Sequence, residues 1–290
     1  MKFKNITATT CLIALIASLV SGCYEKEELN VPVTETSELV DEIDIYIEEN
    51  FTQKYDMAIR YKFVDNYVGV DERAVPPALE NVQPMLEFIQ EFWINPYLEV
   101  SNGADFFANH VPPEIVFLGG PIYNYDGTIT LGTADAGAQI TFTNVNDIDR
   151  EDEEWVALQL HVVYHEFSHT VHQRYKLPNA FEEIAATGYT SGGSWYTLTD
   201  DEALERGFVS PYATSSPNED FAETVSFYLY DKDFIDYFLT DEADCATLDC
   251  ESKNDGREKI REKVASISEH YLKVTGIDLE ELRNIIQAKL

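Results

Sequence analysis

The residues most able to do chemistry lie in one short pattern, His165-Glu166-Phe167-Ser168-His169. Two histidines four residues apart on a helix project from successive turns, so their ring nitrogens can bind one zinc ion at about 2.0–2.1 Å. Glu166 directly follows the first histidine, where its carboxylate can take a proton from zinc-bound water as that water attacks a carbonyl carbon. The pattern therefore predicts a zinc site with hydrolytic chemistry.

A catalytic zinc ion also needs a third protein ligand and an open position for water. The metzincin pattern would place glycine three residues after His169 and histidine three residues further on, but His172 and Tyr175 occupy these positions. His161 cannot join His165 and His169 around one ion, because ligands at this spacing extend about 12 Å along a straight helix. We therefore expect the third ligand from another element, with His161 and His172 orienting substrate or satisfying buried groups.

The segment Asn218-Glu219-Asp220-Phe221-Ala222-Glu223 offers such a ligand. On a helix expected over 219–230, Glu219 and Glu223 lie one turn apart on the same face, whereas Asp220 points about 100° away. Glu219 can ligate zinc while Glu223 accepts a hydrogen bond from a ligand imidazole and fixes its tautomer.

The elements that must position these residues follow from hydrophobic spacing. Acidic residues over 147–154 suit a helix N-terminus, and an apolar stripe predicts a helix from there to about Tyr175. Further helices are expected over 77–92, 219–230 and 257–274 and from 279 onward. The alternating segment 56–64 predicts a strand. Short β-prone runs separated by turn residues predict further strands, which we expect to pair as hairpins, at 114–118, 128–131 and 138–143. The last strand could offer its edge to an extended peptide.

The first 40 residues are expected to lie outside the folded domain. Lys2 and Lys4 precede an apolar run over 11–20 that is too short to span a bilayer and has the length of a signal-peptide core. Val20-Ser21-Gly22-Cys23 resembles a bacterial lipobox, which implies removal of residues 1–22 and a lipid on Cys23; the alternative is an ordinary secretory peptide. Residues 23–40 are acidic and aperiodic and would form a tether. Lys26-Glu27-Glu28 looks like the export signal of lipoproteins on the outer face of the outer membrane, although a periplasm-facing protein remains an alternative.

The net charge of the chain argues against one class of partner, and its cysteines have two possible redox states. The chain has 20 Lys and Arg against 53 Asp and Glu among 290 residues, a net charge of −33, so binding to nucleic-acid phosphates has almost no electrostatic support. Cys245 and Cys250 are the two cysteines left after the signal peptide and Cys23. In an oxidising compartment they could form a disulfide, or they could stay free thiols.

The site residues resemble those of the gluzincin metallopeptidases, and most of all the catalytic domain of anthrax lethal factor. The shared stretch runs from Tyr212 through Glu219 to Ala222-Glu223. The resemblance implies Glu219 as third zinc ligand, Glu223 as partner of a ligand histidine, and Tyr212 as the hydroxyl that stabilises the oxyanion. With its lipobox, the chain is also similar to the substrate import-associated zinc metallohydrolase lipoproteins, which accompany SusC/SusD-like importers and imply a role in nutrient capture.

Together these expectations describe an α+β protein with a zincin-like fold over residues 41–290. A mixed lobe of sheet and helix (about 41–176) and a helical lobe (about 177–290) would flank the active-site cleft. The first functional hypothesis is a lipid-anchored zinc metallopeptidase acting on a peptide or protein. The second is a non-catalytic substrate-binding or accessory lipoprotein of an importer that keeps its zinc site, and the third is a zinc hydrolase of non-peptide amides.

Overall fold

The computed structural model describes residues 41–63, 68–125, 129–130, 132–134, 138–190 and 193–290. The predicted signal peptide, the lipidation site Cys23 and the tether over 23–40 lie outside the described residues. Residues 41–290 form one compact unit. No helix within the described ranges combines the length and the apolar character needed to cross a bilayer.

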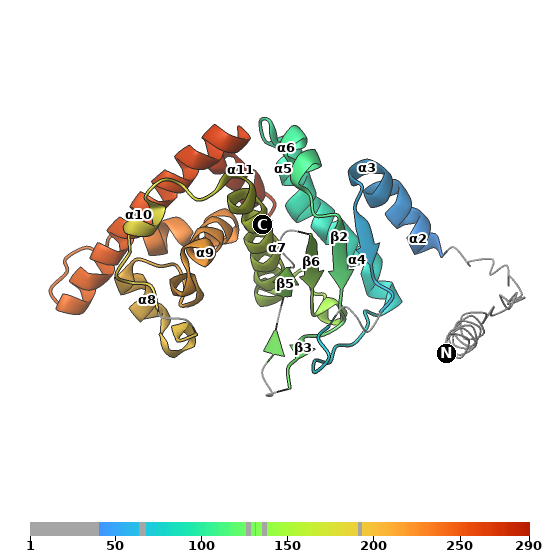
Figure 1. Ribbon diagram of the computed structural model, residues 1–290, viewed down its shortest axis with the longest axis horizontal. Coiled ribbons are helices and arrows are strands. Elements are labelled where there is room, and N and C mark those ends of the chain that lie inside the picture. Colours follow the sequence, from blue (N-terminus) through green and yellow to red (C-terminus); the bar gives the residue numbers. More distant parts are fainter. Residues whose placement is uncertain (1–40, 64–67, 126–128, 131, 135–137, 191–192) are drawn as a thin grey trace, which may run out of the picture. The chain divides into compact units, whose positions relative to one another are not determined.

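Helices make up most of the described chain, as expected for its second half (Figure 1). In chain order they are α2 (Glu42–Ile47), α3 (Gln53–Tyr55), α4 (Leu79–Ile89), α5 (Asn95–Glu99), α6 (Gly103–His110), α7 (Glu153–Tyr175), α8 (Asp200–Arg206), α9 (Pro217–Tyr230), α10 (Leu248–Thr275) and α11 (Leu279–Gln287). Shorter π-helical or 3₁₀ turns occur at Glu48–Thr52, Gln90–Ile94, Val145–Asp147, Phe181–Glu183, Trp195–Thr197, Tyr212–Ser215 and Ile235–Leu239.

Helix α10 begins earlier than its hydrophobic spacing predicts, at Leu248 rather than near Arg257. The side chain of Thr247 caps this end by accepting a hydrogen bond from the backbone N–H of Cys250. The added turns are mostly polar, so they carry no apolar stripe for sequence analysis to detect.

A four-stranded sheet has the order β1-β2-β6-β5, and a separate antiparallel pair joins β3 to β4. The strands are β1 (Ala58–Arg60), β2 (Glu114–Phe117), β3 (Ile122–Tyr123), β4 (Ile129–Thr130), β5 (Gly132–Ala134) and β6 (Gln139–Phe142). Strands β1, β2 and β6 run parallel, and β5 is antiparallel to β6.

The expected hairpin pairing is therefore only partly correct. Antiparallel pairs do form between β3 and β4 and between β5 and β6, but β2 pairs in parallel with both of its neighbours. The helices α4 to α6 connect β1 to β2, and a crossover of that length permits parallel pairing. The strand expected to offer a free edge, β6, lies between β2 and β5, so that prediction is wrong; β1 and β5 are the terminal strands among those described.

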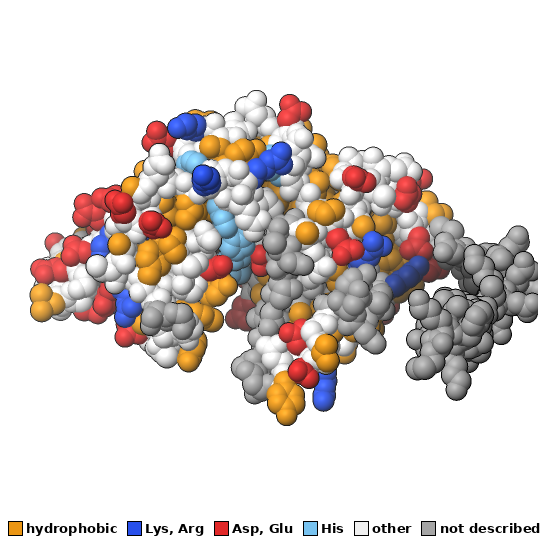
Figure 2. All heavy atoms as spheres, in the orientation of Figure 1, with side chains coloured by type: hydrophobic (Ala, Val, Ile, Leu, Met, Phe, Trp, Pro, Cys, Tyr) orange, Lys and Arg blue, Asp and Glu red, His pale blue; other side chains and the backbone are white. Residues whose placement is uncertain are grey.

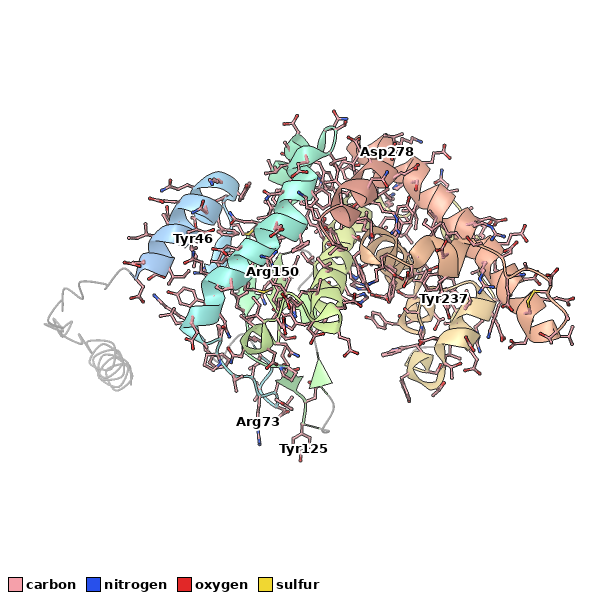
Figure 3. All side chains as sticks on the ribbon, turned by 180° about the vertical axis from the view of Figure 1, so that it is seen from behind. Tyr46, Arg73, Tyr125, Arg150, Tyr237 and Asp278 are labelled. Carbon is pink, nitrogen blue, oxygen red and sulfur yellow. A yellow bond between two sulfur atoms is a disulfide. The ribbon has the colours of Figure 1, made fainter. Side chains whose placement is uncertain are left out.

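Helix α7 lies between the sheet and helix α9 (Figure 1). Its apolar side chains Leu160, Val163, Phe167 and Val171 are buried, as the predicted stripe requires. The imidazole side is largely covered as well, because α9 packs against it. Viewed from behind, the run of α4 and α5 crosses the sheet, and Arg150 lies beside it in an ion pair with Glu91 (Figure 3).

The overall class is thus mixed α+β, dominated by helices around a small and mainly parallel sheet.

The C-terminal helices fix the far end of α9. Arg283 of α11 donates hydrogen bonds to the carbonyl oxygens of Tyr228 and Asp231, and Gln287 donates to those of Leu229 and Tyr230. These contacts satisfy carbonyl groups that a helix C-terminus leaves without partners.

Candidate metal centre

Helix α7 carries the predicted His165-Glu166-Phe167-Ser168-His169 pattern near its middle, as expected. Asp152 caps the helix by accepting hydrogen bonds from the backbone N–H groups of Glu154 and Trp155. An aspartate at this position stabilises a helix by about 1 kcal/mol relative to alanine. The pattern therefore lies on a well-anchored helix that holds its two histidines one turn apart.

Helix α9 brings Glu219 to these histidines. Ser216 caps the helix by accepting the backbone N–H of Glu219 at 3.2 Å, which places Glu219 in the first turn. One face of α9 packs against α7, where the Ser226 hydroxyl donates to the carbonyl oxygen of His161 at 3.0 Å. The sequence neighbour Asp220 points the other way and forms a buried ion pair with Lys263 of α10.

Three donor atoms converge between α7 and α9. The Nε2 atoms of His165 and His169 lie 3.0 Å apart, and Oε2 of Glu219 lies 3.2 Å from the first and 3.3 Å from the second. A zinc ion with tetrahedral bonds of about 2.0–2.1 Å separates its donor atoms by about 3.3 Å. The Oε2 atom is buried and accepts no hydrogen bond from any described residue, so this triangle of donors fits a zinc ion.

The site is partly open to solvent. The side chains of His169 and Glu219 keep 14% and 22% of their surface accessible, against 7% for His165. Figure 2 shows histidine side chains reaching the surface in the middle of one face, with acidic side chains beside them. An ion held by these three residues could therefore also contact water or substrate, as a catalytic zinc must.

Glu223 contacts His165 on the side away from the donor triangle. Its Oε1 lies 2.7 Å from Nδ1 of His165 and 3.1 Å from Nε2 of His161, and its Oε2 accepts the hydroxyl of Ser210 at 2.5 Å. The carboxylate is thus placed beside Nδ1, while Nε2 of His165 faces Glu219. Sequence reasoning gave no role to Ser210, since no spacing links it to the helix.

His161, His165 and Glu223 form a second group of atoms close enough to be considered as metal ligands. In this group His165 would contribute Nδ1, only 2.7 Å from the carboxylate. That separation suits a hydrogen bond better than two ligands of one tetrahedral ion. The donor triangle with Glu219 is therefore the better zinc site.

His172 lies directly behind His169. Its Nε2 is 2.6 Å from Nδ1 of His169, and its ring packs edge-on against Phe221 of α9. Burial, together with the neighbouring His169, lowers the pKa of His172 to about 4, so the ring is neutral at pH 7 and can accept a hydrogen bond. The expectation for this residue went no further than orienting substrate or satisfying a buried group.

The carboxylates and imidazoles strongly influence one another's protonation. Burial disfavours charge on His165, but Glu219 and Glu223 outweigh that effect and raise the pKa of His165 to about 10. Burial alone would raise the pKa of Glu219, but the adjacent imidazoles of His165 and His169 outweigh burial and lower it to about 2. Burial raises the pKa of Glu166, while the two histidines oppose this shift. A carboxyl group with a raised pKa is suited to exchanging a proton near neutral pH.

Tyr212 borders the same site. Its ring centroid lies 5.9 Å from that of His165, and 37% of the residue is exposed. Burial and the nearby carboxylate of Glu219 raise the pKa of Tyr212, which keeps its hydroxyl protonated. Trp195 packs edge-on against Tyr212 at a centroid distance of 5.0 Å. The structure thus brings Tyr212 to the donor cluster, in a position from which its hydroxyl could donate a hydrogen bond.

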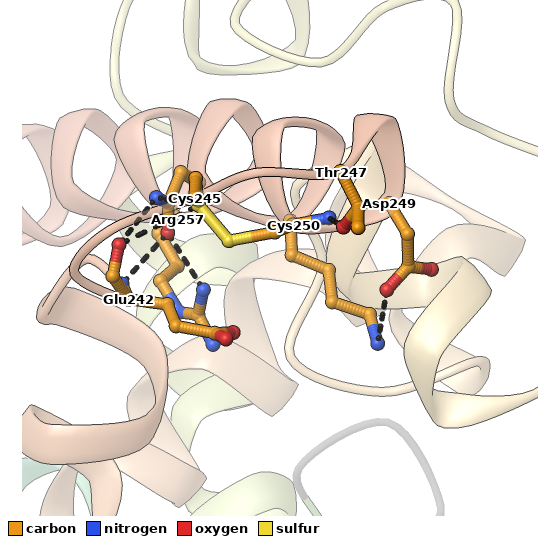
Figure 4. The surroundings of a disulfide bond; sticks show 8 residues. Glu242, Cys245, Thr247, Asp249, Cys250 and Arg257 are labelled. Atoms are coloured by element: carbon orange, nitrogen blue, oxygen red, sulfur yellow. Dashed lines mark hydrogen bonds and ion pairs between the residues drawn. A yellow bond between two sulfur atoms is a disulfide. The ribbon is translucent and has the colours of Figure 1, made fainter.

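Cys245 and Cys250 follow the residues of the donor cluster in the sequence. They form a disulfide, with Cα atoms 5.5 Å apart (Figure 4). Asn254 donates a hydrogen bond to Sγ of Cys245 and to the carbonyl oxygen of Glu242. Of the two states that the sequence left open, the structure therefore has the disulfide, which ties the start of α10 to the preceding loop.

The structure is thus a mixed α+β fold in which a cluster of histidine and glutamate donors could hold a metal ion. The chain belongs to the family described as "Putative zinc-binding metallo-peptidase", whose sequence profile matches residues 36–280.

Among solved structures, the chain is similar to one described as a putative zinc-binding metallo-peptidase from Bacteroides caccae ATCC 43185. The two share 27% sequence identity with a TM-score of 0.68, over 85% of this chain and 90% of that one. Comparison with curated proteins found no match.

Proposed function

We propose that this protein is a zinc-dependent peptidase that hydrolyses peptide bonds, with His165, His169 and Glu219 as zinc ligands. The observation that carries the proposal is the triangle of donor atoms, 3.0 to 3.3 Å apart, on two helices that pack together. Membership of a zinc-binding metallopeptidase family supports both the metal and the reaction class. The resemblance to the gluzincin metallopeptidases supports roles for Glu166, Tyr212 and Glu223 in the reaction.

The chain's own residues divide the reaction between them. Zinc would supply Lewis-acid polarisation of the scissile carbonyl and would make water more acidic. Glu166 accepts a proton from the attacking water as the new C–O bond forms, and it delivers this proton to the leaving amine nitrogen as the C–N bond breaks. Tyr212 donates its hydroxyl hydrogen bond to the oxyanion that develops on the carbonyl oxygen. Glu223 holds His165 in the tautomer that leaves Nε2 free.

We propose that the substrate lies extended across the cleft between the lobes over about 41–176 and 177–290. Donors from α7 and α9 come from either side of that boundary. Strand β5 is the one of the two terminal strands, β1 and β5, that contacts α7 in the described sheet, so its outer edge is suited to pairing with an extended peptide. Main-chain hydrogen bonds along that edge would hold the peptide while the site acts on its carbonyl group.

The first experiment compares metal content and hydrolysis in matched variants. The wild-type protein should bind one zinc ion per chain and cleave a mixture of unstructured peptides. His165→Ala should lose the metal, whereas Glu166→Gln should keep it and lose at least about 100-fold in kcat. Glu154→Gln, an exposed change on the same helix, serves as the control. Zinc binding without hydrolysis in the wild type would favour the accessory importer subunit, and hydrolysis only of non-peptide amides would favour the third hypothesis.

We also propose that the protein is anchored in the outer membrane by lipid on Cys23, faces the cell exterior and works beside a SusC/SusD-like importer. The lipobox-like Val20-Ser21-Gly22-Cys23 and the acidic segment after it support this location. Labelling cells with a radioactive fatty acid should mark the wild type and not Cys23→Ser. Protease added to intact cells should degrade a surface-exposed protein, and cross-linking in the same cells should capture the importer.

A further inference from the structure

The reaction proposed above gives no role to the hydrogen bond between His169 and His172. The two ring nitrogens that form it, Nδ1 of His169 and Nε2 of His172, lie 2.6 Å apart. His172 is only 9% exposed, and its ring packs edge-on against Phe221 at a centroid distance of 6.0 Å. Its orientation is therefore set by packing from α9 as well as by its own helix.

A ligand histidine needs one ring nitrogen free for the metal and the other one protonated. For His165 the group in contact with Nδ1 is the carboxylate of Glu223. For His169 the group in contact with Nδ1 is an imidazole, that of His172, one turn further along α7. The two predicted ligands thus have different partners, one anionic and one neutral.

We propose that His172 is a positioning residue for zinc: it accepts the Nδ1–H of His169 and so directs the Nε2 lone pair of His169 toward His165 and Glu219. The proposal rests on the zinc ligands of the proposed function. Partners of this kind typically change metal affinity by about 10- to 100-fold. Because a neutral acceptor forms a weaker hydrogen bond than a carboxylate, losing His172 should weaken zinc binding less than losing Glu223.

The test replaces His172 by Phe, which keeps a ring but cannot accept, and by Gln, whose amide oxygen can. Zinc affinity is measured by competition with a chelator, and His270→Phe, on α10, is the control. His172→Phe should weaken zinc binding about 10-fold or more, and His172→Gln should recover most of this loss. Equal affinity of His172→Phe and wild type, or an equal loss in both variants, would overturn the proposal.

A second measurement distinguishes an effect of His172 on the orientation of His169 from an effect on folding or on catalysis. In the metal-free proteins, ¹⁵N NMR of His169 should show Nδ1 protonated in the wild type and a mixture of tautomers in His172→Phe, with thermal unfolding showing that both are folded. A zinc-loaded wild type that cleaves no peptide would refute the proposed function and leave the result on His172 intact. A wild type that binds no zinc would refute both.

An independent observation concerns the aromatic side chains beside the site. Trp195 packs edge-on against Tyr212 at 5.0 Å and contacts Tyr196 at 6.1 Å, and Tyr196 is 70% exposed. The Trp195 turn is closed by an internal hydrogen bond, in which the hydroxyl of Thr197 donates to the carbonyl oxygen of Ser194. Two ring contacts therefore join His165, through Tyr212, to an accessible aromatic surface.

From this continuity with the proposed active site we infer a substrate subsite at Trp195 and Tyr196 for a large apolar or aromatic side chain. An extended peptide advances about 3.3–3.6 Å per residue, so a side chain within about two residues of the scissile bond could reach Trp195 from the zinc ligands. Aromatic rings bind such side chains well and lose little conformational freedom in doing so. The inference rests on the proposed peptidase function and names the substrates it prefers.

Short peptide hydroxamates test the subsite, because their metal-binding group reports binding without requiring hydrolysis. A series with Phe, Leu, Ala or Asp at the first and second positions should show about 10-fold tighter binding for Phe or Leu than for Ala at one of them. Trp195→Ala should remove that preference and Trp195→Phe should keep most of it, while Tyr237→Ala, an exposed aromatic on another turn, should leave it unchanged.

Retained selectivity in Trp195→Ala, or no selectivity in the wild type, would overturn the inference. Selective binding without any peptide cleavage would instead refute the proposed hydrolysis alone. Failure of every hydroxamate to bind would overturn both.

Discussion

Lys263 of α10 and Asp220 of α9 form a fully buried ion pair next to the proposed ligand Glu219. Nζ of Lys263 lies 2.7 Å from Oδ2 of Asp220 and donates to the carbonyl oxygen of Gly207 at 2.7 Å. Tyr189 donates its hydroxyl to the same carboxylate at 2.8 Å. Both charged groups are thus well paired, and the pair fixes α9 against α10.

Replacing Lys263 with Met should destabilise the protein by about 3–5 kcal/mol, because it leaves a buried carboxylate without its cation. Burial already raises the pKa of Asp220 and lowers that of Lys263, so both charges are costly even when paired. When the pKa of a carboxyl group is higher in the folded than in the unfolded protein, the free energy of unfolding falls as the pH rises through the folded-state pKa. The variant should therefore be least stable above neutral pH and should recover part of the loss as the medium is acidified.

Urea unfolding of the metal-free proteins measures this effect without contributions from zinc. Asp220→Asn/Lys263→Met, which removes the buried charge and keeps an acceptor for Tyr189, should be more stable than Lys263→Met alone. Lys253→Met, which breaks surface ion pairs on the same helix, should cost less than about 1 kcal/mol. A loss below about 1 kcal/mol in Lys263→Met, or strictly additive losses in the double variant, would refute the argument.

Three further predictions concern packing, the metal and the disulfide. Gly256→Ala should lower the free energy of unfolding by about 1–3 kcal/mol, because the new Cβ would overlap the carbonyl oxygen of Leu204; unchanged urea stability would contradict this. The carboxylates of Glu219 and Glu223 keep a proton on His165, and zinc must displace that proton to bind. The zinc Kd should therefore fall about tenfold per pH unit between about pH 6 and 8. A Kd that does not change with pH in chelator competition would contradict this prediction. Reducing the bond between Cys245 and Cys250 should cost at most about 2 kcal/mol, given its short loop, and leave the zinc stoichiometry at its value in the oxidised protein.

Local periodicity was sufficient to predict the helices that carry the donor cluster. The apolar stripe and the acidic start of α7 predict its position, and a four-residue spacing places His165 and His169 on one face. The same reasoning pairs Glu219 with Glu223 and turns Asp220 away from them. These relations depend on the geometry of a single helix, which the sequence determines within a few residues.

The partners of those residues depended on elements distant in the chain. Nothing in the sequence indicates that Ser210 holds Glu223 or that Lys263 pairs with Asp220. The parallel pairing of β2 with β6, which leaves β5 as a terminal described strand, was equally hidden, because turn residues between strands favour hairpins whichever strands finally pair. A helix repeats its geometry along the chain, so its faces can be read from spacing alone, whereas strand order and side-chain partners are decided only when distant segments pack together.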